Sequence, residues 1–190
     1  MTRIEIAKGF AVEYIEGFYA QAEADELLRG LLDVQMTPEI VKLYGKTHVT
    51  KRRSAQYGAE YNYNVAAKKS QDWTPLMLGI KQRMEAVVGP LHGGLVQVYP
   101  NGDAGLGWHY DKGDPEIIAS LSLGAEREFC FGQMEGKSCT EMFRMRLKHG
   151  SLLLIPAEVN RDYKHIVPTT KRVKEPRVNV TLRRFPWGRN

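Results

Sequence analysis

The pair His109 and Asp111, in the tripeptide His-Tyr-Asp, is the first feature of the sequence that could do chemistry. In a β-strand, residues i and i+2 point to the same side, so this imidazole and this carboxylate can face one point in space. They would supply two thirds of the two-histidine, one-carboxylate set that holds non-haem iron. A histidine hydrogen-bonded to a surface acid has the same spacing, so the pair alone is weak evidence for a metal.

A metal at this pair needs one more histidine, and two follow it in the chain. His149 lies in a Lys-His-Gly-Ser segment that is typical of a tight turn. His165 lies in a segment with strand alternation, which only Pro168 ends. We therefore favour His165 as the third ligand. His48, in a basic loop, and His92, just before a strand, are better suited to solvated or hydrogen-bonded roles.

Residues 177–183, with the sequence RVNVTLR, form the second candidate. In a strand, Arg177, Asn179 and Arg183 share one face, while the valines and the leucine share the other. Arginines on an inward face cost desolvation unless they meet anions, and a small dicarboxylate could pair with both. The alternative is an exposed edge strand that carries cationic side chains.

A mainly β fold must position these side chains. Apolar spacing predicts a helix over residues 20–32 and another over Pro75–Val88, the second capped by Thr74. The chain after Pro90 reads as short strands between Gly, Pro, Asn and Asp turns. A helical preface followed by strands predicts an α+β chain with a two-sheet jelly roll or barrel. We expect eight strands, at residues 95–99, 106–109, 117–123, 128–131, 141–147, 151–155, 162–166 and 177–185.

The composition is that of a soluble single domain. The chain has 190 residues, of which 43% are hydrophobic and 26% charged, so disorder, collagen and coiled coil are poor interpretations. Its two cysteines are too few for a disulfide framework, which predicts a reducing, intracellular compartment, either cytoplasm or nucleus. The apolar runs are far shorter than the roughly 20 residues of a membrane helix, and we expect no membrane partner.

The net charge of +5 is unevenly distributed. Residues 1–30 carry six acidic and three basic side chains, whereas residues 42–53 carry five basic ones and no acid. Residues 161–190 carry nine basic side chains and two acidic ones. Two basic clusters indicate a positive face for a polyanion, although a merely solvated surface explains the charge equally well.

The order of these motifs resembles the AlkB family of Fe(II)- and 2-oxoglutarate-dependent dioxygenases. The resemblance runs from about residue 41 to residue 185, and the stretch PRVNVTLR is its most specific part. Several motifs in one order at fitting separations make coincidence improbable. The residues that carry it are Tyr99, His109, Asp111, His165, Arg177, Asn179, Thr181 and Arg183, together with the stretches RRSAQYG, ASLSLG and HGSLL.

The resemblance implies a double-stranded β-helix, or jelly roll, with helices packed on one side. One domain would span residues 1–190, with residues 1–90 as an extension that carries nucleotide-recognition elements and residues 91–186 as the core. His109, Asp111 and His165 would hold Fe(II). The distal carboxylate of 2-oxoglutarate would be bound by Gln97, Tyr99, Arg177 and Asn179, and its metal-chelating end by Arg183.

The same resemblance implies oxidative dealkylation with O2. A methyl group on a nucleobase nitrogen, as in 1-methyladenine or 3-methylcytosine, would be hydroxylated and lost as formaldehyde, while 2-oxoglutarate becomes succinate. No general acid or base is needed, so we nominate no catalytic residue beyond the metal ligands. The partner would be nucleic acid, with DNA favoured because the resemblance is closest to the duplex-repairing branch, and the protein would be a monomer.

Five further residues would meet the substrate. Tyr44 would be an aromatic finger in the base stack, and Tyr63 would stack on the flipped base, although both could be buried anchors. Lys171 and Arg172 would touch phosphates of the opposite strand. Repair members commonly have a carboxylate two residues after the metal aspartate, where this chain has Gly113. Asp114 either substitutes for it or the preference for cationic bases is weakened.

Three alternatives remain open at this point. The substrate could be RNA, or a protein or small molecule that the same iron chemistry oxidises. The chain could also be a catalytically silent nucleic-acid-binding module on the same fold, although the intact set of ligands argues against it. Conversion of 2-oxoglutarate in the presence of iron and O2 would exclude the silent module.

Overall fold

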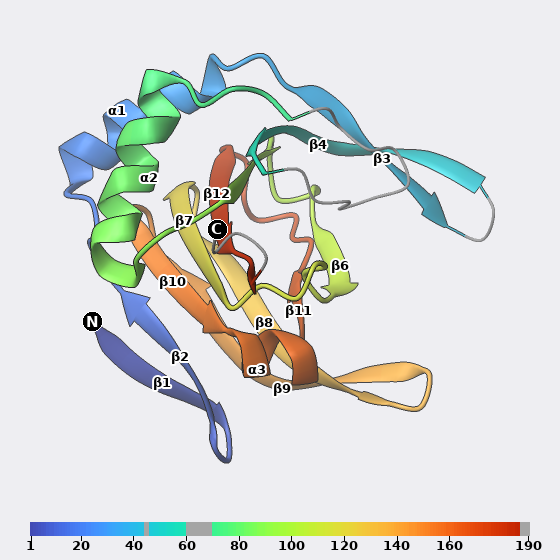
Figure 1. Cartoon of the computed structure of the whole chain (residues 1–190). Helices are drawn as coiled ribbons and strands as arrows, with labels where there is room; N and C mark the ends of the chain where they lie inside the picture. Colours follow the sequence, from blue (N-terminus) through green and yellow to red (C-terminus); the bar gives the residue numbers. More distant parts are fainter. Residues whose placement is uncertain (44–45, 60–69, 187–190) are drawn as a thin grey trace.

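Two antiparallel sheets face each other in the computed structural model, which describes residues 1–43, 46–59 and 70–186, without the side chains of residues 41–43 and 46 (Figure 1). The described elements, in chain order, are β1 (Thr2–Ala7), β2 (Phe10–Ile15), α1 (Gln21–Leu32), β3 (Thr37–Leu43), β4 (Lys46–Gly58), α2 (Pro75–Val88), β5 (Gly93–Tyr99), β6 (Leu106–His109), β7 (Ile117–Gly124), β8 (Arg127–Glu135), β9 (Ser138–Leu147), β10 (Ser151–Pro156), α3 (Ala157–Asp162), β11 (Lys164–Val167) and β12 (Arg177–Arg184).

The larger sheet has eight strands in the order β1-β2-β10-β7-β12-β5-β4-β3, and the smaller has four in the order β6-β11-β8-β9. Strand β12 lies near the centre of the larger sheet, where it pairs with β5 on one side and with β7 on the other. The alternative of an exposed edge strand at residues 177–183 is therefore wrong. The expected mainly β jelly roll with helices on one side is confirmed.

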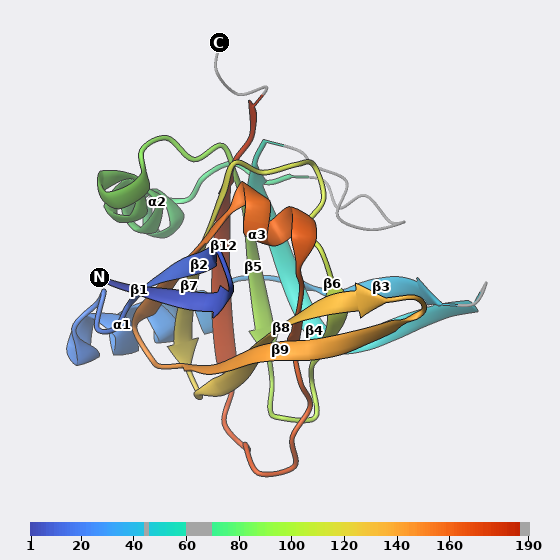
Figure 2. The same cartoon turned by 90° about the horizontal axis from the view of Figure 1, so that it is seen from below.

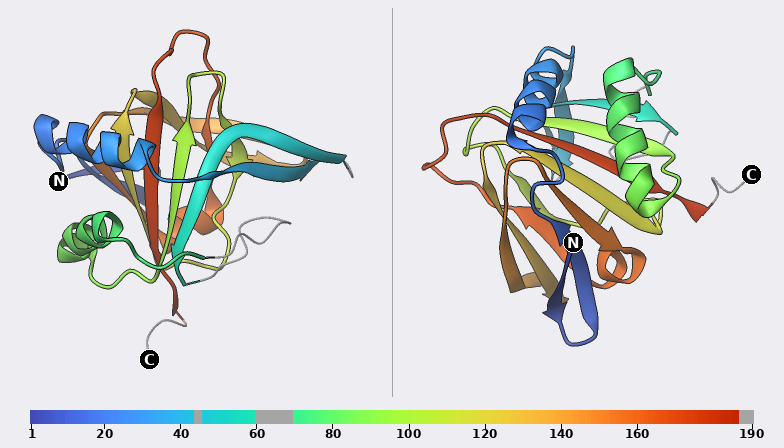
Figure 3. Two further views of the ribbon diagram at one scale, coloured as in Figure 1. Left: turned by 90° about the horizontal axis from the view of Figure 1, so that it is seen from above. Right: turned by 90° about the vertical axis from the view of Figure 1, so that its left-hand side faces the viewer.

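The central strands of the larger sheet have one face toward the helices and one toward the smaller sheet. Val178, Val180 and Leu182 of β12 belong to the cluster that packs under α1 and α2, both of which cover the same face (Figure 3). A second apolar cluster fills the space between the two sheets and includes Tyr99 and Phe131. The two-residue period of a strand thus separates an apolar face from the polar face that lies inside the sandwich.

Local signals explain both long helices. Helix α2 begins and ends where its sequence predicts: the Thr74 hydroxyl accepts a hydrogen bond from the Met77 N–H, Pro75 fits the first turn, and Gly89 ends the helix with a φ of 76°. Helix α1 begins one residue later than expected. Neither these helices nor α3 is long and apolar enough to cross a membrane.

The residues before position 90 do not form a purely helical preface, because they contribute strands β1 to β4, which extend both edges of the larger sheet. Strand β4 contains His48, for which the sequence indicates a basic loop. The short helix α3 interrupts the expected run of strands after Pro90. Strand β1 alternates Arg3 and Glu5 with Ile4 and Ile6, a two-residue period that was available in the sequence.

The basic clusters are also less exposed than their sequences indicate. Arg52 is buried against Glu39, and Arg177 and Arg183 lie inside the sandwich. Lys51, Arg53, Lys171 and Arg172, in contrast, are exposed. Part of the positive charge is therefore buried inside the protein, and only the exposed basic side chains are available to a partner.

Substitution of Leu182 by Ala tests the packing of the central strand. Leu182 is fully buried beneath the helices, and its loss leaves a cavity, so we expect the free energy of unfolding to fall by about 2–5 kcal/mol. The matched control is Leu78→Ala on α2, whose side chain is 39% exposed and which should cost far less. Urea denaturation measures both; equal losses would contradict this packing.

Candidate active site

The smaller sheet brings together three side chains that are far apart in the sequence. His109 at the end of β6 pairs in register with His165 on β11, and Asp111 follows two residues after His109. Nε2 of His109 lies 3.8 Å from Oδ1 of Asp111, and Nε2 of His165 lies 3.7 Å from the same oxygen. One nitrogen or oxygen from each residue falls within 4.8 Å of the others, so the three can hold one metal ion.

Two buried side chains fix Asp111. Nε and Nη2 of Arg183 lie 2.8 Å and 2.6 Å from Oδ2 of Asp111, which leaves Oδ1 toward the histidines. The Asn160 side chain accepts a hydrogen bond from the Asp111 N–H and donates one to its carbonyl oxygen, both at 2.9 Å. The position of Asp111 is therefore set from β12 on one side and from α3 on the other.

The protonation states suit metal binding. Burial alone would raise the pKa of Asp111, but Arg183 and the two histidines hold it far below its usual value, so the carboxylate is ionised. Burial and the neighbouring His165 lower the pKa of His109 to about 3. The Gly107 carbonyl accepts a hydrogen bond from Nδ1 of His109 at 2.8 Å, so Nε2 carries the free lone pair.

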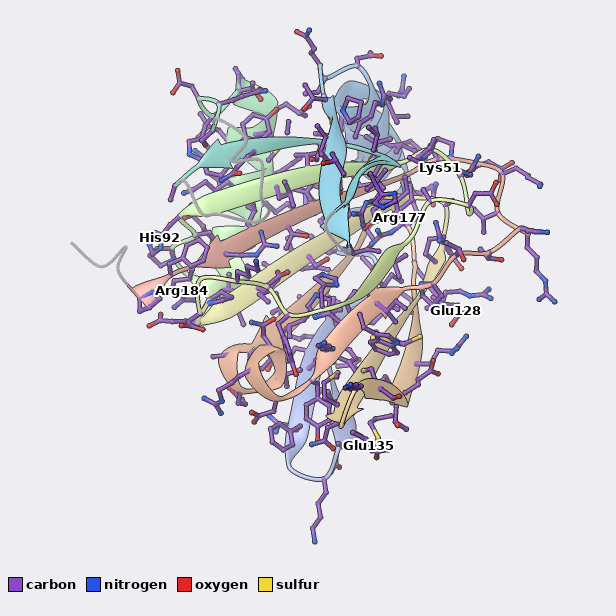
Figure 4. The ribbon with its side chains drawn as sticks, turned by 90° about the vertical axis from the view of Figure 1, so that its right-hand side faces the viewer. Lys51, His92, Glu128, Glu135, Arg177 and Arg184 are labelled. Atoms are coloured by element: carbon purple, nitrogen blue, oxygen red, sulfur yellow. The ribbon has the colours of Figure 1, made fainter. Side chains whose placement is uncertain are left out.

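Arg177 lies inside the sandwich with an incomplete set of partners. Its Nη2 donates to the Ser122 hydroxyl at 2.9 Å, and its guanidinium lies 5.1 Å from the centre of the Tyr99 ring. Nε and Nη1 find no hydrogen-bond acceptor within the described residues. In Figure 4, Arg177 lies at the same end of the molecule as Lys51, whereas Arg184, at the other end of β12, lies close to His92.

The buried charges indicate which kind of group Arg177 lacks. Among the described residues, the buried ionic side chains other than His165 are four arginines and two carboxylates. Asp111 pairs with Arg183, and Glu39 with Arg52. Arg127 donates to four backbone carbonyls, of Asn101, Gly102, Ala104 and Pro168. That leaves Arg177 without an acid, and a buried cation is costly until an anion reaches it.

The metal-binding trio lines a cavity inside the sandwich. Gln97, Tyr99 and Asn179 line it together with the trio, and Ile118, Phe129 and Ile155 supply apolar walls. Asn179 donates to the Ser120 hydroxyl and to the Leu121 carbonyl. The residues therefore fit the iron and the dicarboxylate that the sequence predicts: three ligands that can hold one metal ion, a cavity beside them, and an arginine next to Tyr99 that lacks an anion.

Two contacts differ from the roles that the sequence suggested. Arg183, expected at the metal-chelating end of 2-oxoglutarate, contacts the metal-binding Asp111 itself. Gln97, expected to bind the distal carboxylate, donates from Nε2 to Oε1 of Glu39 at 2.8 Å. Both side chains still line the cavity, so neither contact excludes a role in ligand binding.

The expected substrate-binding residues are scattered over the structure or lie outside the described residues. Tyr44 and Tyr63 lie outside the described residues. Asp114 is exposed and has a φ of 49°, which is unusual for a residue other than glycine. At Gly113, where a carboxylate was expected by resemblance, φ is 84°, and an added Cβ would lie 3.1 Å from the Phe185 ring. Lys171 and Arg172 are exposed in the loop before β12.

Sequence reasoning missed three buried polar residues beside the site: Glu39, Arg127 and Asn160. Asn160 sits on a helix of only six residues, too short for apolar periodicity to reveal. Its available signals were Pro156 before the helix and Glu158 in the first turn. No sequence pattern distinguishes Glu39 and Arg127 from exposed charges.

Comparisons with known proteins agree with this site. A sequence model of the 2OG-Fe(II) oxygenase superfamily matches residues 11–183. The mouse protein named DNA oxidative demethylase ALKBH2 is 32% identical, over 94% of this chain and 82% of its own length. The human protein of that name is also 32% identical, over 88% of this chain and 70% of its own length. Human alpha-ketoglutarate-dependent dioxygenase alkB homolog 3 is 32% identical over 88% of this chain, which spans 63% of that protein.

Solved structures share the fold. The structure of OsALKBH1 matches with a TM-score of 0.58 and 15% identity, over 91% of this chain and 97% of the other. An oxidoreductase of the 2OG-Fe(II) oxygenase family from Burkholderia pseudomallei matches with the same TM-score and 14% identity, over 90% of this chain and 84% of the other. With the sequence matches above, the chain therefore belongs to the AlkB family of the 2OG-Fe(II) oxygenase superfamily and is a dioxygenase that uses Fe(II), 2-oxoglutarate and O2.

Proposed function

We propose that this dioxygenase removes methyl groups from the ring nitrogens of nucleobases in DNA and releases formaldehyde and succinate. The observation that carries the proposal is the metal-binding trio beside an unpaired buried arginine, in a chain 32% identical to proteins named DNA oxidative demethylase. Bases such as 1-methyladenine and 3-methylcytosine are the proposed substrates. RNA is the alternative substrate.

In this proposal His109, Asp111 and His165 hold Fe(II), which together with 2-oxoglutarate and O2 supplies the oxidation of the methyl carbon. Arg183 occupies Oδ2 of Asp111, so this carboxylate offers the iron a single oxygen, Oδ1. Nε2 of each of the two histidines completes the set. The remaining positions around the iron stay open for the cosubstrates, because no other described metal-binding side chain joins the group.

Arg177 binds the distal carboxylate of 2-oxoglutarate in this account, because its guanidinium has N–H groups that lack an acceptor within the described residues. An arginine forms strong charge-assisted hydrogen bonds with a carboxylate. Tyr99 lies beside the same guanidinium, and Gln97 and Asn179 line the adjacent wall. The apolar side chains Phe129, Ile118 and Ile155 keep water from the cosubstrate.

The nucleic acid is proposed to approach from the side where β6 and β11 lie. The β3–β4 and β8–β9 hairpins both extend beyond the body on this side (Figure 2). Exposed Lys51 and Arg53 on β4 can meet phosphates, as can Lys171 and Arg172. A base must leave its stack to reach the iron, and Tyr44 and Tyr63 are the proposed finger and stacking partner.

The first prediction of this proposal concerns the metal site. His165→Ala removes one of three ligands, and we expect it to retain less than about a tenth of the iron that the unmodified protein binds. The matched control is His149→Ala, because His149 contacts the Gly124 N–H and Asp25, away from the trio. Iron per chain is measured after anaerobic dialysis. Equal retention by both variants would contradict the ligand assignment.

The second prediction concerns the cosubstrate. Arg177→Gln removes the buried cation that awaits an anion, so we expect the KM for 2-oxoglutarate to rise at least about thirtyfold. Arg29→Gln, on the exposed surface of α1, serves as the control and should leave this KM unchanged. Succinate formation measures both variants. An unchanged KM in Arg177→Gln would place the distal carboxylate elsewhere.

The third prediction tests the substrate. Four oligonucleotides, carrying 1-methyladenine or 3-methylcytosine in a single strand or a duplex, are incubated with protein, Fe(II), 2-oxoglutarate and ascorbate. We expect base restoration, which His109→Ala abolishes, and a duplex preference that Tyr44→Ala reduces. Steady succinate formation without any restored base would reject the nucleic-acid substrate, and would make the missing carboxylate at Gly113 the first feature to examine.

A further inference from the structure

A second buried ion pair lies beside the cavity, and neither of its side chains has a role in the proposed function. Glu39 of β3 is 3% exposed and Arg52 of β4 is 2% exposed. Oε2 of Glu39 lies 2.6 Å from Nη2 of Arg52, and Oε1 accepts the hydrogen bond from Nε2 of Gln97. One carboxylate thus joins the edge strand β3 to β4 and to β5.

An irregularity in strand pairing turns this pair inward. Pro38 pairs with Arg53 and Ile40 with Val49, so Glu39 alone faces the three residues 50–52. The Thr50 hydroxyl accepts from the Arg52 N–H and donates to the Arg52 carbonyl, which stabilises the bulge. Bulges at sheet edges re-aim side chains, and this one coincides with a buried pair that faces the cavity wall.

The carboxylate decides how the Gln97 amide is oriented. An ionised carboxylate only accepts hydrogen bonds, so the NH2 group of Gln97 must face Glu39, and the amide cannot flip without losing this bond. Gln97 lines the cavity and pairs across the sheet with Asn179, two residues along the strands from the Tyr99–Arg177 pair and therefore on the same face. The orientation of its carbonyl and second N–H in the cavity therefore depends on Glu39.

Arg52 makes a carboxylate tolerable at this place. A buried negative charge near the binding site of a dicarboxylate would repel the ligand unless a cation offset it. The Arg52 guanidinium lies 5.5 Å from the centre of the Tyr99 ring, so the offsetting charge is on the cavity side of the sheet. The pair can thus orient an amide without adding net charge.

We propose that Glu39 is a positioning residue for 2-oxoglutarate, acting through Gln97, an inference that rests on the proposed binding of this cosubstrate between Gln97, Tyr99 and Arg177. Glu39 does not touch the ligand. It holds the Gln97 amide in the one orientation that the cavity uses, and it fastens the β3–β4 hairpin to the wall of the site.

The test is calorimetric titration of 2-oxoglutarate into the full Fe(II)-loaded chain without O2, and without nucleic acid. We expect Glu39→Ala and Gln97→Ala each to weaken binding by about fivefold to twentyfold, the range for one hydrogen bond next to a charged group. The double variant should bind no more weakly than either single one, because both changes remove the same contact. Glu39→Gln, which can still accept from Gln97, should recover most of the affinity.

Glu141→Ala is the matched control, since Glu141 forms an ion pair with Arg144 on the exposed strand β9. It should leave binding unchanged. If Glu39→Ala does not fold because Arg52 has lost this carboxylate, Glu39→Ala/Arg52→Ala removes both charges, and adding Gln97→Ala to it should not weaken binding further.

Unchanged affinity in Glu39→Ala, or losses that add in the double variant, would overturn the role of Glu39 while leaving the proposed function intact. A failure of the unmodified protein to bind 2-oxoglutarate would overturn both. Reaction kinetics give an independent readout: Glu39→Ala should raise the KM for 2-oxoglutarate and leave kcat at saturation within about twofold. A fall in kcat alone would contradict the inference.

Discussion

The ion pair between Arg183 and Asp111 is the interaction on which the site depends. Asp111 follows a strand of the smaller sheet and Arg183 belongs to the centre of the larger one, so the pair links the two layers at the metal-binding trio. Both side chains are almost fully buried, and an isolated charge there would be costly. The pair keeps Asp111 ionised and directs one carboxylate oxygen to the histidines.

The geometry of the central strand explains why polar side chains lie inside the sandwich beside its apolar cluster. Strand β12 presents valines and a leucine to the helices, and the packing of that face leaves the opposite face to arginines, Asn179 and Thr181. Each buried guanidinium but one has its compensation within the described residues, in a carboxylate or in backbone carbonyls. The exception, Arg177, is the residue at which we propose that the dicarboxylate binds.

Much of the candidate site could be predicted from the sequence, because the patterns that indicate it lie within short segments. The spacing of His109 and Asp111 and the alternation of residues 177–183 each follow from strand geometry, and the caps of α2 are explicit. The residues whose roles could not be predicted depend on contacts between segments that are distant in the sequence. Arg52 looks like one of five exposed cations until its partner Glu39, thirteen residues earlier on a neighbouring strand, is placed beside it. Asn160 acts only once α3 is brought to Asp111.

The most direct test of the account is a crystal structure of the protein with Fe(II) and 2-oxoglutarate, prepared without O2. The account predicts iron between Nε2 of His109, Nε2 of His165 and Oδ1 of Asp111, with Arg183 still on Oδ2. It predicts the distal carboxylate on the guanidinium of Arg177. A carboxylate bound by Arg183, with the contact to Asp111 broken, or an Arg177 that remains without an anion, would contradict it.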